Sequence, residues 1–243
     1  MRALLIALCA TAALTTACNG SSPGASPTPS ATGRPDAFTA LAPPRSPGVG
    51  DFPVITSQRA YEAARGLLAL SLAEPGTLNG SATASLLEGL AVPDPAFSVA
   101  PYLRTPTRRG LDIRPLFART VTLADDFVEV VRSSYSADAV QGAGGEQGIR
   151  VTWDGAVRYR VTVAGVAREV AYVLHVAYVF ESLPNEPGGL RLVQVLPGTS
   201  HAAPVVASCY AKGSILPAAG SPTSSDFAPG PWLPAPAGPA CPV

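Results

Sequence analysis

The chain has few of the side chains that most often serve metal-ion or nucleic-acid chemistry. Its 243 residues include two histidines, His175 and His201, and a single lysine, Lys212. Basic and acidic residues balance at 17 each, so no excess of positive charge favours nucleic acid as a partner. Two histidines so far apart in the sequence do not predict a metal site, and we expect no cofactor.

Motifs of several enzyme classes are missing or out of place as well. The Gly-x-Ser-x-Gly sequence occurs once, at 20–24, but it lies in a Pro/Ser-rich stretch and not between a strand and a helix, where the nucleophile elbow of α/β-hydrolases stands. Ser208 stands four residues before Lys212, whereas the Ser-x-x-Lys motif of penicillin-binding enzymes needs three. The glycine-rich run at 142–148 precedes a predicted strand, whereas phosphate-binding glycine loops open a helix. We therefore interpret this run as a hairpin loop.

The first residues have the order of a secretory signal peptide. Arg2 is followed by an apolar run at 3–14 and then by small residues up to Ala17. This run is shorter than the ~20 residues that a membrane-spanning helix needs. We expect residues 1–17 to be removed on export, which places the protein outside the cytoplasm.

Cys18 follows these small residues directly. The sequence Leu-Thr-Thr-Ala-Cys resembles the lipobox of bacterial lipoproteins, although Leu14 is one position further from the cysteine than usual. The resemblance implies that Cys18 carries a diacylglyceryl group, and two acyl chains anchor a protein stably. We expect a lipoprotein on the extracytoplasmic face of the cell membrane. The alternative is an ordinary signal peptide followed by an incidental cysteine.

Segments rich in proline, serine and alanine flank the central part of the chain. Residues 18–50 predict a tether, because they have too few large apolar side chains to form a core. Residues 199–243 predict a loose Pro-rich tail. This tail contains Cys209 and Cys241, which we expect to form a disulfide outside the cytoplasm, the alternative being two free thiols.

Two helices are expected at the start of the central part. Thr56 or Ser57 would cap a helix that continues through 58–72, with an apolar face formed at helical spacing by Tyr61, Ala64, Leu68 and Leu72. The Pro75-Gly76 pair would end it. A second helix, capped by Ser81, is predicted at 82–91.

Strands follow the helices. The predicted strands are 121–133, 149–153, 156–163, 166–182 and 190–196. Asp154-Gly155 predicts a hairpin turn between two of them, and Ala164-Gly165 predicts another. In the longest strand, the bulky residues stand at even positions, a pattern that only Arg168 breaks, so we expect one buried face. Residues 51–198 are therefore predicted to form an α+β domain, with helices packed on an antiparallel meander.

Helices followed by a curved antiparallel meander with one long strand resemble NTF2-like (cystatin-like) domains. The chain also resembles exported actinobacterial-type lipoproteins of unknown function. The first resemblance implies a cone with a pocket between sheet and helices. It favours a non-catalytic binding or assembly module of the cell envelope, with an envelope protein or a small apolar ligand as partner. The alternative is a small-molecule enzyme of the ketosteroid-isomerase type.

Four side chains are candidates for such a pocket. Glu129 has apolar neighbours on both sides, and desolvation would raise its pKa toward that of a general base. Tyr159, Tyr172 and Tyr178 stand on the bulky faces of their strands and would donate hydrogen bonds to a ligand. The alternative, which we favour, places the tyrosines in the core and Glu129 at the rim or outside.

Arginines gather ahead of the first strand, at Arg104, Arg108, Arg109 and Arg114. Such a group would bind anionic lipid headgroups, wall polymers or an acidic partner. The alternative interpretation is a solvated surface without a partner.

Overall fold

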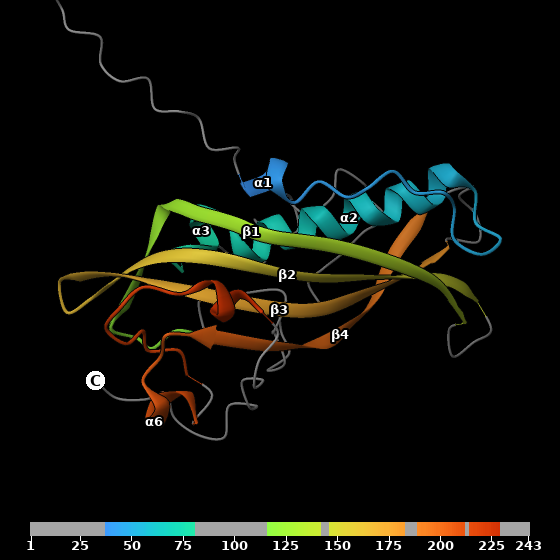
Figure 1. The fold of residues 1–243 in the computed structure, drawn as a ribbon. Coiled ribbons are helices and arrows are strands. Elements are labelled where there is room, and N and C mark those ends of the chain that lie inside the picture. Colours follow the sequence, from blue (N-terminus) through green and yellow to red (C-terminus); the bar gives the residue numbers. More distant parts are fainter. Residues whose placement is uncertain (1–36, 81–115, 142–145, 183–188, 212–213, 229–243) are drawn as a thin grey trace, which may run out of the picture. The chain divides into compact units, whose positions relative to one another are not determined.

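A computed structural model describes residues 37–80, 116–141, 146–182, 189–211 and 214–228, except for the side chains of Phe38, Asp125, Asp126 and 197–199. Its elements, labelled in Figure 1, are α1 (Ala37–Ala40), α2 (Val54–Leu72), α3 (Pro75–Leu78), β1 (Val121–Gln141), β2 (Gln147–Val163), β3 (Val166–Ser182), β4 (Leu190–Ala203), α6 (Ala207–Tyr210) and the 3-10 helix η2 (Ser224–Phe227). The predicted α+β class is confirmed.

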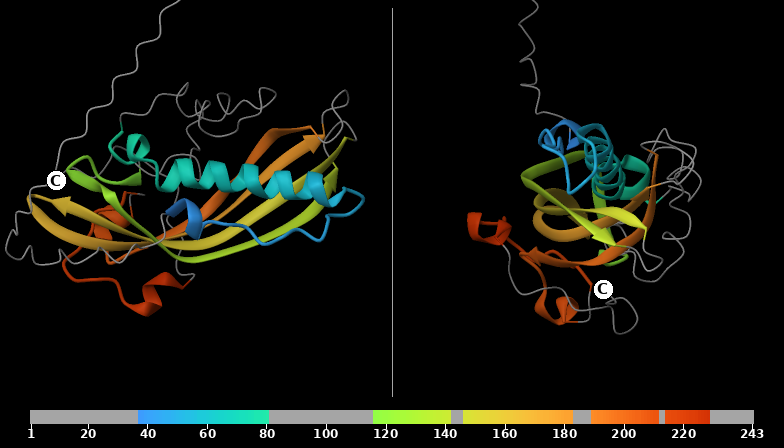
Figure 2. Two further views of the ribbon diagram at one scale, coloured as in Figure 1. Left: turned by 90° about the horizontal axis from the view of Figure 1, so that it is seen from above. Right: turned by 90° about the vertical axis from the view of Figure 1, so that its right-hand side faces the viewer.

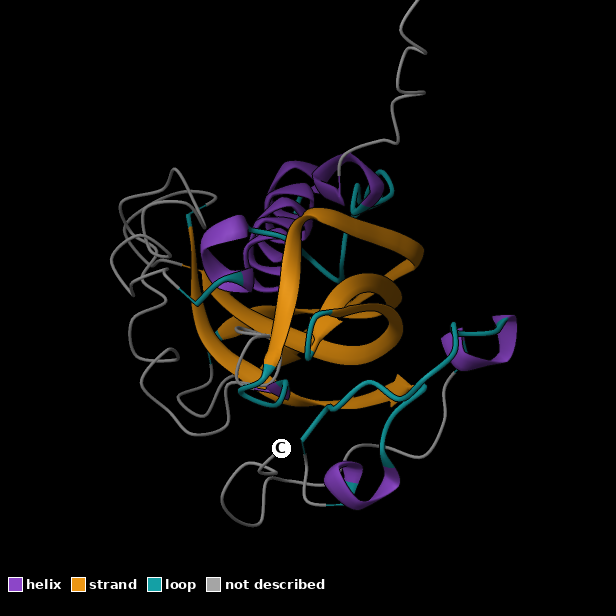
Figure 3. Ribbon diagram, turned by 90° about the vertical axis from the view of Figure 1, so that its left-hand side faces the viewer, coloured by secondary structure: helices purple, strands orange, loops and turns teal. Residues whose placement is uncertain are grey.

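The four strands form one antiparallel sheet in the order β1-β2-β3-β4. They are long, and β1 alone has 21 residues. The sheet is strongly curved, and α2 lies along its concave face (Figures 2 and 3). The buried side of α2 includes Tyr61, Ala64, Leu68 and Leu72, which are the apolar residues that the helical spacing predicts.

Strand β3 has the bounds that the sequence predicts, and its even-numbered residues fill the core. Six of them have no more than 1% of their surface exposed: Val170, Tyr172, Leu174, Val176, Tyr178 and Phe180. The prediction of a single buried face is wrong, however. On the outer face, Ala171 and Val173 form a second buried cluster with Ala156 and Phe227. Phe227 comes from the C-terminal segment, which therefore covers part of the sheet.

The predicted hairpin at Asp154-Gly155 is wrong, because both residues lie inside β2. Asp154 pairs with Ser134 on one side and with His175 on the other. Gly155 is needed for packing and not for a turn, because a Cβ atom there would lie 2.0 Å from Cζ2 of Trp153. The hairpin at Ala164-Gly165 is confirmed, and both of its residues have positive φ angles, 49° and 79°.

Helix α2 begins earlier than predicted and without a side-chain cap. Pro53 occupies the N-cap position, and Thr56 and Ser57 lie buried within the first turn. The helix ends at Leu72, and Pro75 opens the short helix α3 because proline suits a first helical turn. The predicted second helix at 82–91 lies outside the described residues.

The C-terminal segment belongs to the folded domain as far as the structure describes it. Strand β4 passes the predicted boundary at residue 198 and ends at Ala203. Ile215 and Leu216 are buried in the main core. Cys209 is 3% exposed. Cys241 lies outside the described residues, so the disulfide between them stays a prediction.

Candidate functional site

The three tyrosines that we considered as ligand-binding residues lie in the core. Tyr159 and Tyr178 are fully buried, and Tyr172 is 1% exposed. The Tyr159 hydroxyl donates a hydrogen bond to the carbonyl oxygen of Leu72 at 2.8 Å, at the C-terminal end of α2. Burial raises the pKa of Tyr159 and of Tyr178 well above the usual value. These hydroxyls are therefore neutral, and that of Tyr159 fastens the helix to the sheet.

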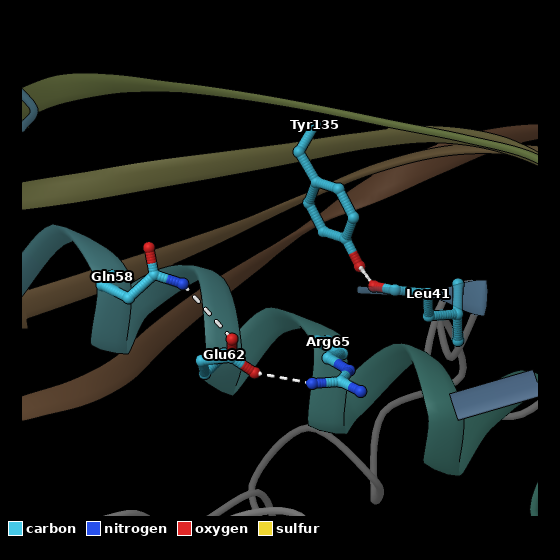
Figure 4. A network of polar contacts seen from close by, with 5 residues as sticks. All are labelled: Leu41, Gln58, Glu62, Arg65 and Tyr135. Atoms are coloured by element: carbon cyan, nitrogen blue, oxygen red, sulfur yellow. Dashed lines mark hydrogen bonds and ion pairs between the residues drawn. The ribbon is translucent and has the colours of Figure 1, made fainter. Parts of the chain in front are cut away.

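A fourth tyrosine, which the sequence did not single out, fastens the segment before α2. The hydroxyl of Tyr135 on β1 donates to the carbonyl oxygen of Leu41 at 2.7 Å (Figure 4). Its ring meets that of Tyr61 edge to face at 6.0 Å. Figure 4 also shows Glu62 of α2 accepting hydrogen bonds from Gln58 and Arg65. The sequence did not predict a role for Tyr135, because the predicted strand ended at residue 133 whereas β1 continues to Gln141.

Glu129 lies on the outer face of the sheet, away from the core tyrosines. It is opposite Arg158 in the β1–β2 register, and its Oε2 is 3.1 Å from the Arg158 Nη1 atom. Tyr159 follows Arg158 in β2, so its side chain points to the opposite face. About a third of the Glu129 side chain, 30%, is exposed. The carboxylate is therefore held by an arginine and does not meet the tyrosine hydroxyls.

The remaining sequence candidates do not form a centre for catalysis or metal binding. His175 Nδ1 lies 3.4 Å from an Asp154 oxygen, and Arg132 pairs with the other oxygen. His201 contacts the Tyr210 hydroxyl at 3.2 Å. Within the described ranges, no three His, Cys, Asp or Glu side chains come together as metal ligands. The group formed by Arg104, Arg108, Arg109 and Arg114 lies outside those ranges.

A groove of about 440 Å³ lies where β2 and β3 meet the C-terminal segment. Its lining residues are Arg160, Val166, Ala167, Arg168, Glu169, Ala219, Gly220 and Ser221. Its volume falls within the ~300–1,000 Å³ usual for ligand sites. It combines charged side chains with small residues and with Val166, an apolar residue that is 57% exposed. We therefore take this groove as the candidate functional site.

The two arginines of the groove differ from the other arginines of the sheet. Each of the other four pairs with a carboxylate: Arg132 with Asp154, Arg150 with Asp138, Arg158 with Glu129 and Arg191 with Glu181. The Arg160 guanidinium instead lies 4.2 Å from the Phe127 ring centroid. Arg168 donates a hydrogen bond to the backbone carbonyl of Pro217. Among the described side chains, neither has a carboxylate within ion-pair distance, although Glu169 is opposite Arg160 in the β2–β3 register and also lines the groove. Two guanidinium groups against one carboxylate leave the described lining with a net positive charge, which favours an anionic group.

The groove could not be found from the sequence, because one of its walls comes from residues 219–221, far along the chain. One signal did point to it. Arg168 is the residue that interrupts the bulky face of β3, where the alternation calls for an apolar side chain. Its register partner Val161 is still part of the core, and Arg168 instead reaches the C-terminal segment, where it donates to the Pro217 carbonyl.

In the part of the chain that the structure describes, no helix is both long and apolar enough to cross a membrane. Comparison with protein-family models, with curated proteins and with solved structures finds no match to this chain.

Proposed function

We propose that this protein is a lipid-anchored binding or assembly module of the cell envelope, non-catalytic and built on an NTF2-like α+β domain. The anchor is argued from the predicted signal peptide at 1–17 and from Cys18, which follows it directly. The NTF2-like assignment is supported by the long helix α2 on the concave face of a curved antiparallel meander. The observation that carries the proposal is the groove with Arg160 and Arg168, which have no carboxylate partner among the described side chains.

The alternative function, a small-molecule enzyme, depended on Glu129 as the general base, and the position of Glu129 does not favour that role. A general base must reach a bound substrate in a site that excludes water. Glu129 instead contacts Arg158 on the outer face, opposite to the tyrosines. The hydroxyl of Tyr159 is already bonded to the fold. We therefore do not propose a reaction of the ketosteroid-isomerase type.

The anchor would keep the groove close to partners in the same membrane. Residues 19–36 connect Cys18 to α1 and reach about 60 Å when fully extended. Confinement to the same membrane surface shortens the search for neighbouring proteins to the reach of this tether. A modest affinity in the groove would then be enough for assembly.

Replacing Cys18 tests the anchor. In cells, the Cys18→Ser variant should leave the membrane fraction and the detergent phase, because no diacylglyceryl group can be attached. The Ser22→Ala variant, in the same segment, serves as the matched control and should stay in the membrane fraction. Partition of Cys18→Ser that equals that of the unchanged protein would contradict the anchor.

Crosslinking tests the groove. A photoreactive amino acid at Ala219, an exposed residue of the groove wall, should give an adduct with an envelope protein in living cells. The Arg160→Ala change should reduce that adduct. The control places the same group at Ser136, an exposed residue of β1 outside the groove, where the adduct should not form. Equal adducts at both positions, or none at Ala219, would count against a binding site here.

A further inference from the structure

One end of β3 extends beyond its neighbour β4. Pairing between the two strands ends at Ala171 and Ala203, whereas pairing of β3 with β2 continues to Val166. Residues 166–170 therefore have a strand on one side only. The groove is lined by this end of β3, by Arg160 of β2 and by residues 219–221. In Figures 1 and 2, the β2–β3 hairpin extends past β4 at this end of the sheet.

The hairpin turn determines which backbone groups face the open side. Ala164 and Gly165 are the two central residues of the turn, so Val163 and Val166 form its hydrogen-bonded closing pair. Hydrogen-bonding direction alternates along an antiparallel strand. The N–H and C=O groups of Ala167 and Glu169 consequently point away from β2. Within the described residues, the C-terminal segment makes no backbone hydrogen bond to either of them.

We propose that the groove binds an extended, acidic peptide segment of a partner protein, which adds as a strand to the open edge of β3. This inference rests on the proposed function and specifies the partner of the same site. Strand addition uses backbone hydrogen bonds for affinity and alternate side chains for specificity. Here the backbone groups of Ala167 and Glu169 would form the hydrogen bonds, and the side chains of the groove would determine the specificity.

The charges of the groove select an acidic segment. Arg160, on the outer face of the sheet, offers a planar guanidinium group, which binds carboxylates with two parallel hydrogen bonds. Arg168 lies on the opposite face of its strand and donates to the Pro217 carbonyl, so it adds positive charge at the other side of the same edge. Val166 adds an exposed apolar contact for a neighbouring peptide side chain. The carboxylate of Glu169 opposes an acidic ligand. A bulge opposite Arg160 carries Asp125 and Asp126, whose side chains are not among those that the structure describes. Removing the charge of Glu169 should therefore strengthen binding.

An NMR titration of the ¹⁵N-labelled Cys18→Ser chain tests the proposal. The probe is a capped pentapeptide with the sequence Val-Asp-Val-Asp-Val, and its control has lysine in place of both aspartates. The acidic peptide should shift the amide signals of Ala167 and Glu169 and weaken about fivefold or more with Arg160→Ala, because a charge-assisted contact is lost. Arg150→Ala, on the same strand but paired with Asp138, should leave the affinity unchanged. Glu169→Gln should tighten it about two- to fivefold.

A proline substitution tests the proposed backbone hydrogen bonds separately from the charged side chains. Ala167→Pro removes an N–H that points away from β2, so the β2–β3 ladder stays intact while the peptide loses a donor. The peptide affinity should fall about tenfold, with the remaining amide spectrum preserved.

Several outcomes would overturn the proposal. Equal affinity for the lysine peptide would show that the arginines do not select an acidic ligand. Amide signals of Ala167 and Glu169 that do not shift at mM concentrations of the acidic peptide would contradict strand addition. Arg160-dependent binding to phosphatidylglycerol vesicles, with no peptide binding, would make the groove a lipid site. If the crosslinked adduct and the membrane partition persist while the peptide fails, the proposed function stands and this inference alone falls.

Discussion

Replacing Gly155 by alanine is expected to lower the free energy of unfolding by about 2–3 kcal/mol, the cost of overfilling a packed core. The added Cβ atom would lie 2.0–2.5 Å from three ring atoms of Trp153. That ring is fully buried, and its Nε1 donates a hydrogen bond to Ser133 Oγ at 3.0 Å. The indole therefore cannot move aside without breaking this bond or displacing its neighbours.

Urea denaturation of paired variants measures this effect. In a Trp153→Leu background, Gly155→Ala should cost less than about 1 kcal/mol, because the side chain that the methyl group meets is gone. Thr162→Ala, at an exposed position of the same strand, should change stability by no more than about 0.5 kcal/mol. Equal losses from Gly155→Ala in both backgrounds would show that strand propensity and not the indole controls this position.

The same residues explain why the sequence misled us at Asp154-Gly155. This pair is a strong hairpin signal when apolar runs flank it. A two-residue turn, however, would transfer the buried side from odd to even positions, because Trp153 would then pair with Ala156. The buried residues stay odd on both sides of the pair, as Val151, Trp153, Val157 and Tyr159 show. The apolar alternation therefore stays on odd positions across Asp154-Gly155 in the sequence itself, a pattern that indicates one continuous strand.

Local patterns predicted the elements whose formation depends on neighbouring residues. The bounds of β3, the turn at Ala164-Gly165 and the apolar face of α2 all follow from periodicity and turn chemistry. Contacts between distant segments could not be predicted this way. Phe227 covers Ala171 from more than 50 positions away, and only the folded chain brings them together. The groove depends on the same C-terminal segment, so it too was beyond sequence reasoning.

Replacing Tyr159 by phenylalanine is expected to lower the free energy of unfolding by about 1–3 kcal/mol at pH 7, because the Leu72 carbonyl loses its buried donor. The variant should also change the response to alkali. Burial raises the pKa of Tyr135, Tyr159 and Tyr178 in the folded protein, whereas unfolded tyrosines titrate near pH ~10. Above that pH the unfolded chain releases protons that the folded chain retains. Stability is therefore fully present below pH ~10 and falls as the pH rises further.

Each of the three tyrosines contributes a slope of about −1.4 kcal/mol per pH unit above its unfolded pKa. Urea denaturation at pH 9, 10.5 and 11 measures the free energy of unfolding. This free energy should fall less steeply with pH for Tyr159→Phe than for the unchanged protein, by about 1.4 kcal/mol per pH unit, the contribution of one tyrosine. Phe180→Leu alters a buried aromatic residue of β3 that has no hydroxyl, so it should lower stability without changing the slope. An unchanged slope in Tyr159→Phe would mean that this hydroxyl ionises as readily in the folded protein as in the unfolded chain. The hydrogen bond to Leu72 would then not be what fastens α2 to the sheet.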